Sequence, residues 1–321
     1  MDAITHGLVG GLIARLGPTE KLGGSATAVG VAAAVLPDID YALFVAGPGA
    51  YYCHHRETTH SLLGGIAMAT IVAVLANAAT GRKAFAAFWG VAVAGFLSHL
   101  VLDVLTPFGT LAFFPFSDRR LAGDVLGLLD PWLSLIVFAA TAIGFSPRHR
   151  ARAALFGLAL VVGYVGGLVG VRQLAVARTR EEAKGIQGVR RIEVLPVPML
   201  PFAWHGIVDA KGSYYVFEVR GGDTRLVRIV SKAVETRWVE KVRQDPVAAP
   251  FFKAARFPVI QDAVDEGGHH ITVHDLGLEL AAGRPLFLLK ADITPAPVGS
   301  PANEEQVGIQ VILREAAEQA K

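Results

Sequence analysis

The sequence predicts a mainly α-helical protein, in which a polytopic membrane bundle of about five to six apolar helices precedes a small β-rich soluble domain. Two observations lead to this fold class. Of the 321 residues, 52% are hydrophobic and 18% are charged, whereas about a quarter of a soluble domain is charged. The charges are also uneven, with 20 in residues 1–177 and 38 in residues 178–321. We therefore expect a membrane domain at 1–177, a linker at 178–189 and an extramembrane domain at 190–321.

The N-terminal part contains several apolar segments. A helix needs about 20 apolar residues to cross a bilayer, and residues 61–80 form such a run without any charge. The other candidates are 24–47, 84–105 and 153–177, with shorter segments at 3–16 and 131–146. All are rich in Gly and Ala, which lets helices pack closely in lipid.

Basic residues in the short loops predict the orientation. Arg82 and Lys83 lie in one loop, and Arg148, Arg150 and Arg152 lie in another on the same side. The positive-inside rule makes that side cytoplasmic. We therefore expect the candidate site residues and the C-terminal domain to lie at the outer face.

After Arg178 the pattern changes from helical to strand-like. Alternating and β-branched runs, separated by glycine-containing breaks, are typical of antiparallel strands. They occupy residues 214–220, 224–230, 270–276, 284–293 and 307–313. Residues 294–306 are expected to form a Pro-rich polar loop.

The segment SHLVLDVL, residues 98–105, carries the strongest chemical signal. His99 and Asp103 are four residues apart, so on a helix they lie on the same face. A carboxylate within a membrane segment is costly and indicates function. The pair could chelate one metal ion, or it could be a buried pair that holds helices together.

The segment HHRETTHS, residues 54–61, directly precedes an apolar run. Glu57 and His60 have the three-residue spacing of carboxylate–imidazole metal sites in helix bundles. His60 is the better metal candidate. Arg56 and Glu57 are secondary candidates that could merely form a polar helix start. His54 and His55 are expected to be loop residues.

Two further segments offer metal ligands. In LPDID, residues 36–40, Asp38 and Asp40 can both point into one site only if the helix breaks, and Pro37 makes such a break plausible. In DAITHGL, residues 2–8, Asp2 and His6 are four apart, and an N-terminal cap with a solvated histidine is the alternative.

These candidate ligands are imidazoles and carboxylates. Such donors favour zinc, with manganese or iron as alternatives. A two-metal centre would use a bridging carboxylate, for which Asp40 and Asp103 are the candidates, and would activate water for hydrolysis near neutral pH.

Several other polar residues have both a functional and a structural interpretation. Arg119 and Arg120 could bind a phosphate or contact solvent and lipid headgroups. Asp130, before Pro131, fits an N-cap, with a site role as the secondary alternative. Asp124 could be a cap or a ligand. His270 and His274 are expected to be solvated strand residues.

Several functions are disfavoured. A net charge of +2, without a basic patch, argues against a nucleic-acid partner. The single cysteine, Cys53, excludes an intrachain disulfide and a thiolate metal cluster. The sequence contains no P-loop, dinucleotide fingerprint or GxSxG elbow.

An N-terminal Thr-His pair, LPDID, HRETTHS and SHLVLDVLTPFG occur in this order over roughly the first 180 residues. This combination resembles the YdjM-type inner-membrane metal-dependent hydrolases, a family that looks distantly similar to zinc-dependent phospholipase C and the zinc single-strand nucleases. The resemblance implies a bacterial inner-membrane location and implies Asp40, His60, His99 and Asp103 as ligands, with His6 matching an early ligand. Those zinc enzymes place further ligands soon after His-x-x-x-Asp, whereas here Thr106 and Pro107 follow.

The expected function is hydrolysis of a phosphoester, either a small molecule or a lipid-linked phosphate, by metal-activated water at the membrane surface. Membrane lipids are the expected surroundings. The alternative is a cation-binding or transporting membrane protein that uses the same His/Asp cluster. A third interpretation is a structural protein in which His–Asp pairs join helices.

Overall fold

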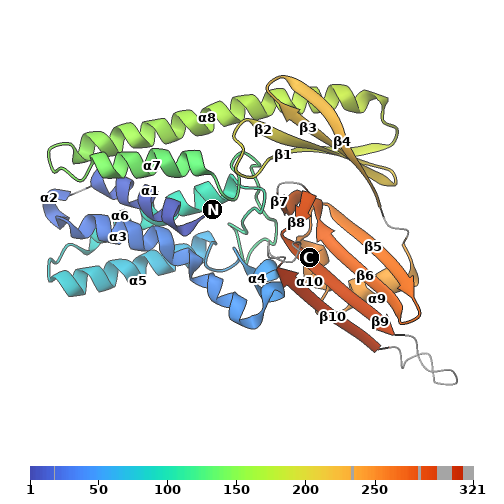
Figure 1. Ribbon diagram of the computed structural model, residues 1–321. Coiled ribbons are helices and arrows are strands. Elements are labelled where there is room, and N and C mark those ends of the chain that lie inside the picture. Colours follow the sequence, from blue (N-terminus) through green and yellow to red (C-terminus); the bar gives the residue numbers. More distant parts are fainter. Residues whose placement is uncertain (18, 233–234, 281–282, 295–305, 314–321) are drawn as a thin grey trace, which may run out of the picture.

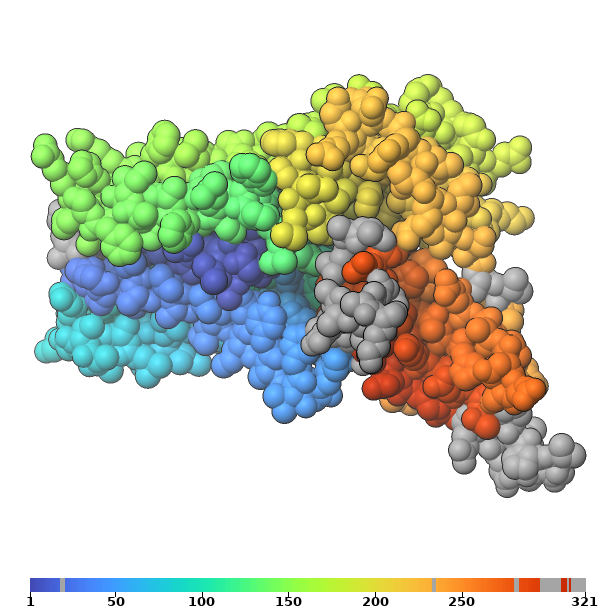
Figure 2. Space-filling view, in the orientation of Figure 1, coloured from blue at the N-terminus to red at the C-terminus, as the bar shows by residue number. Residues whose placement is uncertain are grey.

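The computed structural model describes residues 1–17, 19–232, 235–280, 283–294 and 306–313. It shows a helical bundle followed by a β-rich domain, which confirms the predicted fold class (Figure 1, Figure 2). The expected loop at 294–306 falls almost wholly outside the described residues.

The bundle is built from seven α-helices of the described chain. They are α1 (Ala3–Arg15), α2 (Thr19–Leu22), α3 (Ser25–Val35), α5 (Leu62–Thr80), α6 (Phe85–Val104), α7 (Pro131–Ile143) and α8 (Arg150–Glu182). Four segments are long and apolar enough to cross a membrane: Ser25–Ala46, Leu62–Thr80, Phe85–Val104 and Arg150–Gly185. Large apolar side chains such as Leu75 and Phe156 are exposed on the outside of the bundle, as expected for helices that face lipid.

The helices approach one another through small residues. A Cβ atom on Gly95 of α6 would lie 2.7 Å from the Gly30 carbonyl oxygen of α3, and a Cβ atom on Gly10 of α1 would lie 2.4 Å from the same oxygen. Helix α3 is therefore held tightly between α1 and α6. This packing brings together three chain segments that carry predicted ligands.

Helix α3 ends at Val35 and continues as the 3₁₀ helix η1 (Leu36–Ala46). The predicted break at Pro37 is thus present as a change of helix type. The short helix α4 (Pro48–His54) follows. Residues 55–61 form a turn before α5, whose N-cap is Ser61, so Glu57 and His60 do not share a helix.

The β-rich domain contains two four-stranded antiparallel sheets. The first has the order β1 (Val189–Pro196), β2 (Ala203–Ala210), β3 (Ser213–Arg220) and β4 (Asp223–Ser231). The second has the order β10 (Gln306–Leu313), β9 (Phe287–Thr294), β6 (Gly268–Asp275) and β5 (Pro258–Asp265). Helices α9 (Arg237–Gln244) and α10 (Ala249–Ala254) connect them, and β7 (Glu279–Leu280) pairs with β8 (Arg284–Pro285).

Helix α8 joins the two parts of the molecule. Its 33 residues correspond to a length of about 50 Å, which exceeds a hydrocarbon core of about 30 Å. The helix therefore extends beyond the bundle, through residues 178–182 of the expected linker, and the first sheet packs along it (Figure 1). A Cβ atom on Gly206 of β2 would lie 2.3 Å from Thr179 Oγ1, so the contact is close.

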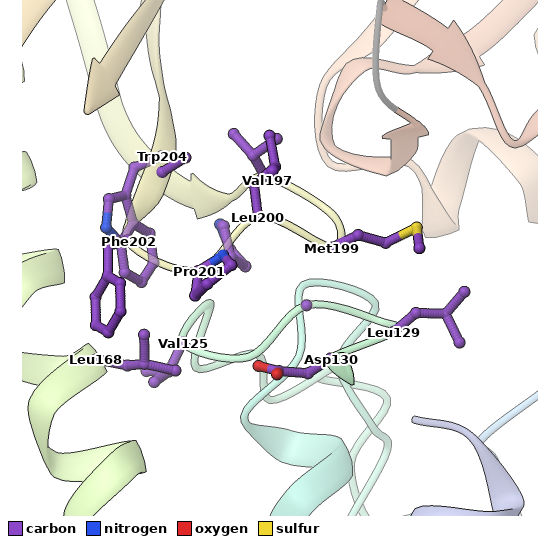
Figure 3. Close-up of a pocket in the computed structure, with 13 residues that line it drawn as sticks. Val125, Leu129, Asp130, Leu168, Val197, Met199, Leu200, Pro201, Phe202 and Trp204 are labelled. Atoms are coloured by element: carbon purple, nitrogen blue, oxygen red, sulfur yellow. The ribbon is translucent and has the colours of Figure 1, made fainter. Parts of the chain in front are cut away.

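The loop that joins β1 and β2 closes this junction. Figure 3 shows Met199, Leu200 and Pro201 of the loop above the turn that carries Asp130. The space between them is about 10 Å³, which is barely enough for one water molecule. Asp130 accepts hydrogen bonds from the backbone of Trp132 and Leu133 and from Tyr164 Oη, which confirms its predicted role as the α7 N-cap.

Candidate metal centre

The predicted ligands meet at one end of the bundle, the end that faces the β-rich domain. His6 lies in the first turns of α1, Asp38 and Asp40 in η1, His60 before α5, and His99 and Asp103 at the end of α6. The turn between α5 and α6, which carries Arg82, lies at the opposite end (Figure 1). All six ligand side chains are buried, with exposed fractions of 9% or less.

Four ligand atoms form the core of the centre. Asp103 Oδ2 lies 3.3 Å from His60 Nε2 and 3.2 Å from His99 Nε2. Asp38 Oδ1 lies 3.6 Å from His60 Nε2 and 3.9 Å from His99 Nε2. Two ligands of a tetrahedral zinc ion lie roughly 3.3 Å apart, because each bond is about 2.0–2.1 Å long. The two imidazoles and two carboxylates therefore have the chemistry and nearly the spacing of such a site.

The hydrogen bonds of the two histidines leave the correct nitrogen free. His99 Nδ1 donates to the Ala34 carbonyl oxygen at 2.7 Å, so the His99 Nε2 lone pair points into the centre. His60 Nδ1 lies 2.9 Å from Thr59 Oγ1, which itself donates to Asp40 Oδ2 at 3.0 Å. Such partners fix the tautomer of a metal-binding histidine.

Several of these inward-facing atoms have no hydrogen-bond partner. They are His60 Nε2, His99 Nε2 and Asp103 Oδ2, and the second oxygen of Asp38, Oδ2, is also buried and unpaired. Buried polar atoms are almost always paired, and nitrogen lone pairs that face carboxylate oxygens repel each other unless a cation lies between them. The residues present therefore fit a divalent metal ion.

The charges in the pocket also favour a cation. Burial alone would lower the pKa of His60, but the neighbouring carboxylates of Asp103, Asp38 and Asp40 raise it to about 9. The pocket thus stabilises an added positive charge at His60, and a metal ion would supply that charge in place of the proton.

Asp40 has a different environment from Asp38. Its Oδ1 lies 2.9 Å from His55 Nδ1, and its Oδ2 accepts from the Arg56 backbone N–H and from Thr59 Oγ1. The carboxylate is therefore fully engaged in positioning the 55–60 turn. A second group of potential ligands, Asp40 with His55 and His60, nevertheless lies within metal-binding distance.

His55 is a buried member of the centre, although the sequence suggested only a loop residue. Its exposed fraction is 4%. Burial lowers the pKa of His55 to about 4, against the opposing hydrogen bond to Asp40. The available signal was its position in a wholly polar segment between two apolar ones.

His6 and Arg56 complete the wall around Asp103. His6 Nε2 lies 3.2 Å from Asp103 Oδ1, and the His6 and His99 rings stack with centroids 3.7 Å apart. Arg56 Nη2 lies 2.8 Å and the Met1 amino group 2.5 Å from the same Oδ1. One carboxylate oxygen of Asp103 thus meets positive groups, while the other faces the two free imidazole nitrogens.

Arg56 is held by an unusual backbone geometry. Its φ of 65° lies in the left-handed region, and its Nη1 donates to Thr106 Oγ1 at 2.8 Å. Strained residues of this kind cluster at functional sites. The structure thus brings Arg56 into the centre, whereas Glu57 points away and pairs with His54 at 3.0 Å.

The remaining candidates lie outside the centre. Asp2 caps α1, and Asp124 pairs with Arg256 at 2.6 and 3.0 Å. His270 and His274 lie in the second sheet, each paired with a nearby carboxylate. Arg119 is exposed, and Arg120 lines a cavity beside the turn.

An open cleft of about 620 Å³ adjoins the centre. Asp40, Thr58 and Thr59 form its polar side, and Leu43 and Val45 contribute to its apolar side. Val45 is 93% exposed. The cleft therefore borders the centre at Asp40, along a surface that is polar on one side and apolar on the other.

Comparison with known proteins identifies a family of membrane proteins. The family model described as "YdjM inner membrane protein" matches residues 1–174. An uncharacterized protein of Bacillus subtilis (strain 168), YfhP, is 23% identical over 288 residues, which cover 87% of this chain and 86% of that protein. No solved structure matches. Similarity to phospholipase C is not among these findings.

Proposed function

Since the chain belongs to the YdjM family of inner membrane proteins, we propose that it is a membrane-bound, metal-dependent hydrolase of phosphoesters. The observation that carries this proposal is the convergence of four buried ligand groups, Asp38, His60, His99 and Asp103, beside an open cleft. Three of the converging atoms, His60 Nε2, His99 Nε2 and Asp103 Oδ2, have no hydrogen-bond partner. A divalent ion such as zinc would activate water and stabilise developing negative charge.

The protein's own residues have distinct roles in this proposal. Asp38, His60, His99 and Asp103 would hold the ion, and His6 or the Asp40–His55 pair would supply ligands if a second ion binds. Asp40 acts mainly as a positioning residue, because it orients His60 through Thr59. Arg56 holds Asp103 Oδ1 and so keeps Oδ2 directed at the imidazoles.

An amphiphilic phosphoester fits the location of the centre. The cleft beside Asp40 has an apolar wall that includes Val45, at the end of a segment long enough to span a membrane. The scissile group of a lipid-linked phosphate would lie at this depth. We place the centre and the β-rich domain at the outer face, because the basic loops gather at the opposite end of the bundle.

The alternative is a cation-binding or transporting protein. Transport sites lie near the bilayer midplane, whereas His99 and Asp103 belong to the last two turns of α6. A location at one helix end favours the hydrolase.

The test is a hydrolysis assay on the full chain in detergent, loaded with zinc, manganese or iron. Substrates are a soluble aryl phosphodiester, a soluble phosphomonoester and phospholipid vesicles. We expect metal-dependent release of phosphate or alcohol, reduced at least about 100-fold in Asp38→Asn and unchanged in His270→Gln. A folded, metal-loaded protein that hydrolyses none of them, but moves the ion across a liposome membrane, would replace the proposal with transport. Hydrolysis of the soluble substrates alone would exclude the lipid substrate.

A further inference from the structure

A second cavity lies between the bundle and the β-rich domain, separate from the cleft at Asp40. Its volume is about 1040 Å³. Helix α4 and the loop after α6 form one side, and α10 with its neighbours forms the other. Figure 1 shows α10 next to α4 at this junction. His54 and Glu57 line both hollows, so the two adjoin.

Cationic side chains dominate the lining of this cavity. Four arginines and a lysine face three carboxylates, and each of these carboxylates already has a partner. Asp118 pairs with Lys253 at 2.6 Å, Glu57 with His54 at 3.0 Å, and Glu193 lies 4.0 Å from Arg256. With five cationic side chains against three carboxylates, the formal charge of the lining is positive.

Arg120 is the partly buried cation of this cavity that has no carboxylate partner among the described residues. Its Nη2 donates to the carbonyl oxygens of Cys53 and His55 at 3.3 and 3.1 Å, and its guanidinium lies 4.9 Å from the centre of the Phe108 ring. Nη1 is buried and has no hydrogen-bond partner. Within the described residues, no carboxylate lies within 4.0 Å of this guanidinium. A buried charge is costly unless it is paired.

The position of Arg120 relates this charge to the metal centre. The backbone of His55 accepts its hydrogen bond, and the side chain of the same His55 contacts Asp40. An anion bound beside Arg120 in this cavity would thus lie one residue away from the centre but outside the ligand cluster. A guanidinium is well suited to bind phosphate oxygens.

We propose that Arg120 binds an anionic group of the phosphate class in this cavity, and that this group belongs to the substrate. The substrate class is then a phosphoester with a second anionic group besides the scissile one. The anion site stands on the cavity and on Arg120, whereas its assignment to the substrate rests on the proposed function.

The single cysteine provides a direct probe, because Cys53 lines this cavity. The full chain in detergent is labelled with an anionic and a cationic methanethiosulfonate of similar size, and the ratio of the two rates is measured. The ratio cancels changes in thiol ionisation. We expect the ratio of the anionic to the cationic labelling rate at Cys53 to be about tenfold higher than the same ratio for a free thiol in solution. Arg120→Gln should abolish this preference, and the exposed neighbour Arg119→Gln should largely keep it.

Inorganic phosphate is the ligand probe in the same assay. It should slow labelling of the wild type and of Asp103→Asn, but not of Arg120→Gln. Protection that is lost in Asp103→Asn would place phosphate on the metal centre and overturn the proposed location. An unchanged rate ratio in Arg120→Gln, without protection in the wild type, would overturn the site itself.

A second pair of variants tests the anion site even if Arg120→Gln does not fold. Ala122 lines the cavity and has no part in holding Arg120. Ala122→Glu adds a negative charge and should abolish protection, whereas Ala122→Gln, of the same shape, should retain it. Equal protection in both variants would contradict an electrostatic anion site.

Kinetics distinguish a substrate group from free phosphate. With a phosphoester that carries a second phosphate, Arg120→Gln should raise KM about tenfold and leave kcat within about twofold. With a phosphoester that has only the scissile phosphate, KM should not change. Equal effects on both substrates would remove the assignment to the substrate, while phosphate protection of Cys53 would still support the anion site.

Discussion

Two regions of this protein place histidines against aspartates, and they differ in how many ring nitrogens of each histidine form hydrogen bonds. In the second sheet, His270 uses both ring nitrogens, Nδ1 with Asp292 at 2.7 Å and Nε2 with Asp265 at 3.0 Å. In the bundle, His60 and His99 each use one nitrogen for a hydrogen bond and leave the other unpaired toward Asp103. His270 is 41% exposed, whereas both bundle histidines are fully buried.

The difference shows that the proximity of His and Asp does not by itself indicate a metal site. An exposed imidazole between two carboxylates is satisfied by a proton, and Asp292 and Asp265 indeed raise the pKa of His270. A buried cluster with free lone pairs and unpaired carboxylate oxygens requires a cation to be stable. The predictions below test this contrast, from the largest expected effect to the smallest.

Removal of a core ligand should have the largest effect. His99→Gln deletes the Nε2 that lies 3.2 Å from Asp103 Oδ2. We expect metal affinity to fall at least about 100-fold, as measured by competition with a chromogenic chelator. An affinity within threefold of the wild type would exclude His99 as a ligand.

Removal of the positioning carboxylate should have a smaller effect. Asp40→Asn weakens the contacts to His55 and Thr59 but keeps the four core ligand atoms. We expect a 10- to 100-fold loss of metal affinity, which is typical of partners that orient a ligand. The same chelator titration checks it, and a loss as large as that of His99→Gln would instead make Asp40 a direct ligand.

The helix packing beneath the centre can be tested with two glycines of α6. Gly95→Ala places a Cβ atom 2.7 Å from the Gly30 carbonyl oxygen, whereas Gly90→Ala meets nothing within 4 Å. We expect Gly95→Ala to reduce stability by about 1–3 kcal/mol. It should also weaken metal binding, because it separates His99 from the Ala34 carbonyl. In detergent, the midpoint of thermal unfolding should fall for Gly95→Ala but not for Gly90→Ala. An equal fall in both variants would contradict this packing.

The exposed cluster should show the smallest effect. His270→Gln should leave metal content and activity unchanged and should not measurably shift the midpoint of thermal unfolding. Elemental analysis and a thermal melt check both expectations. A loss of bound metal in this variant would mean that the sheet cluster, rather than the bundle, holds the ion.

The elements that could be predicted from the sequence are those with a strong local pattern of apolar and polar residues. Long apolar runs predicted the spanning segments, and the strands around residues 213–231 were predicted from their alternation. Strands β1, β2 and β5 were not predicted. Pro196 and Gly206 interrupt the usual strand composition of β1 and β2. Gly206 is explained only by the close approach of α8, which is a tertiary contact.

In the candidate site, too, residues whose role depends on tertiary contacts could not be predicted from the sequence. His99 and Asp103 were predicted together because one helix face fixes their separation. The role of His55 was not predictable, because its burial depends on the fold of the 55–61 turn against η1. Likewise, Arg119 and Arg120 are adjacent in sequence, but only Arg120 contacts the carbonyl oxygens of Cys53 and His55 and the Phe108 ring, and these are tertiary contacts.

The most direct test of the central claim is the metal content of the purified full chain beside Asp103→Asn, measured by elemental analysis. Asp103 contacts both free imidazole nitrogens through one oxygen, so the account predicts near-stoichiometric zinc, manganese or iron in the wild type and little in the variant. A well-folded wild type that holds no metal after incubation with these ions would contradict the account and leave His–Asp pairing as a structural feature of the bundle.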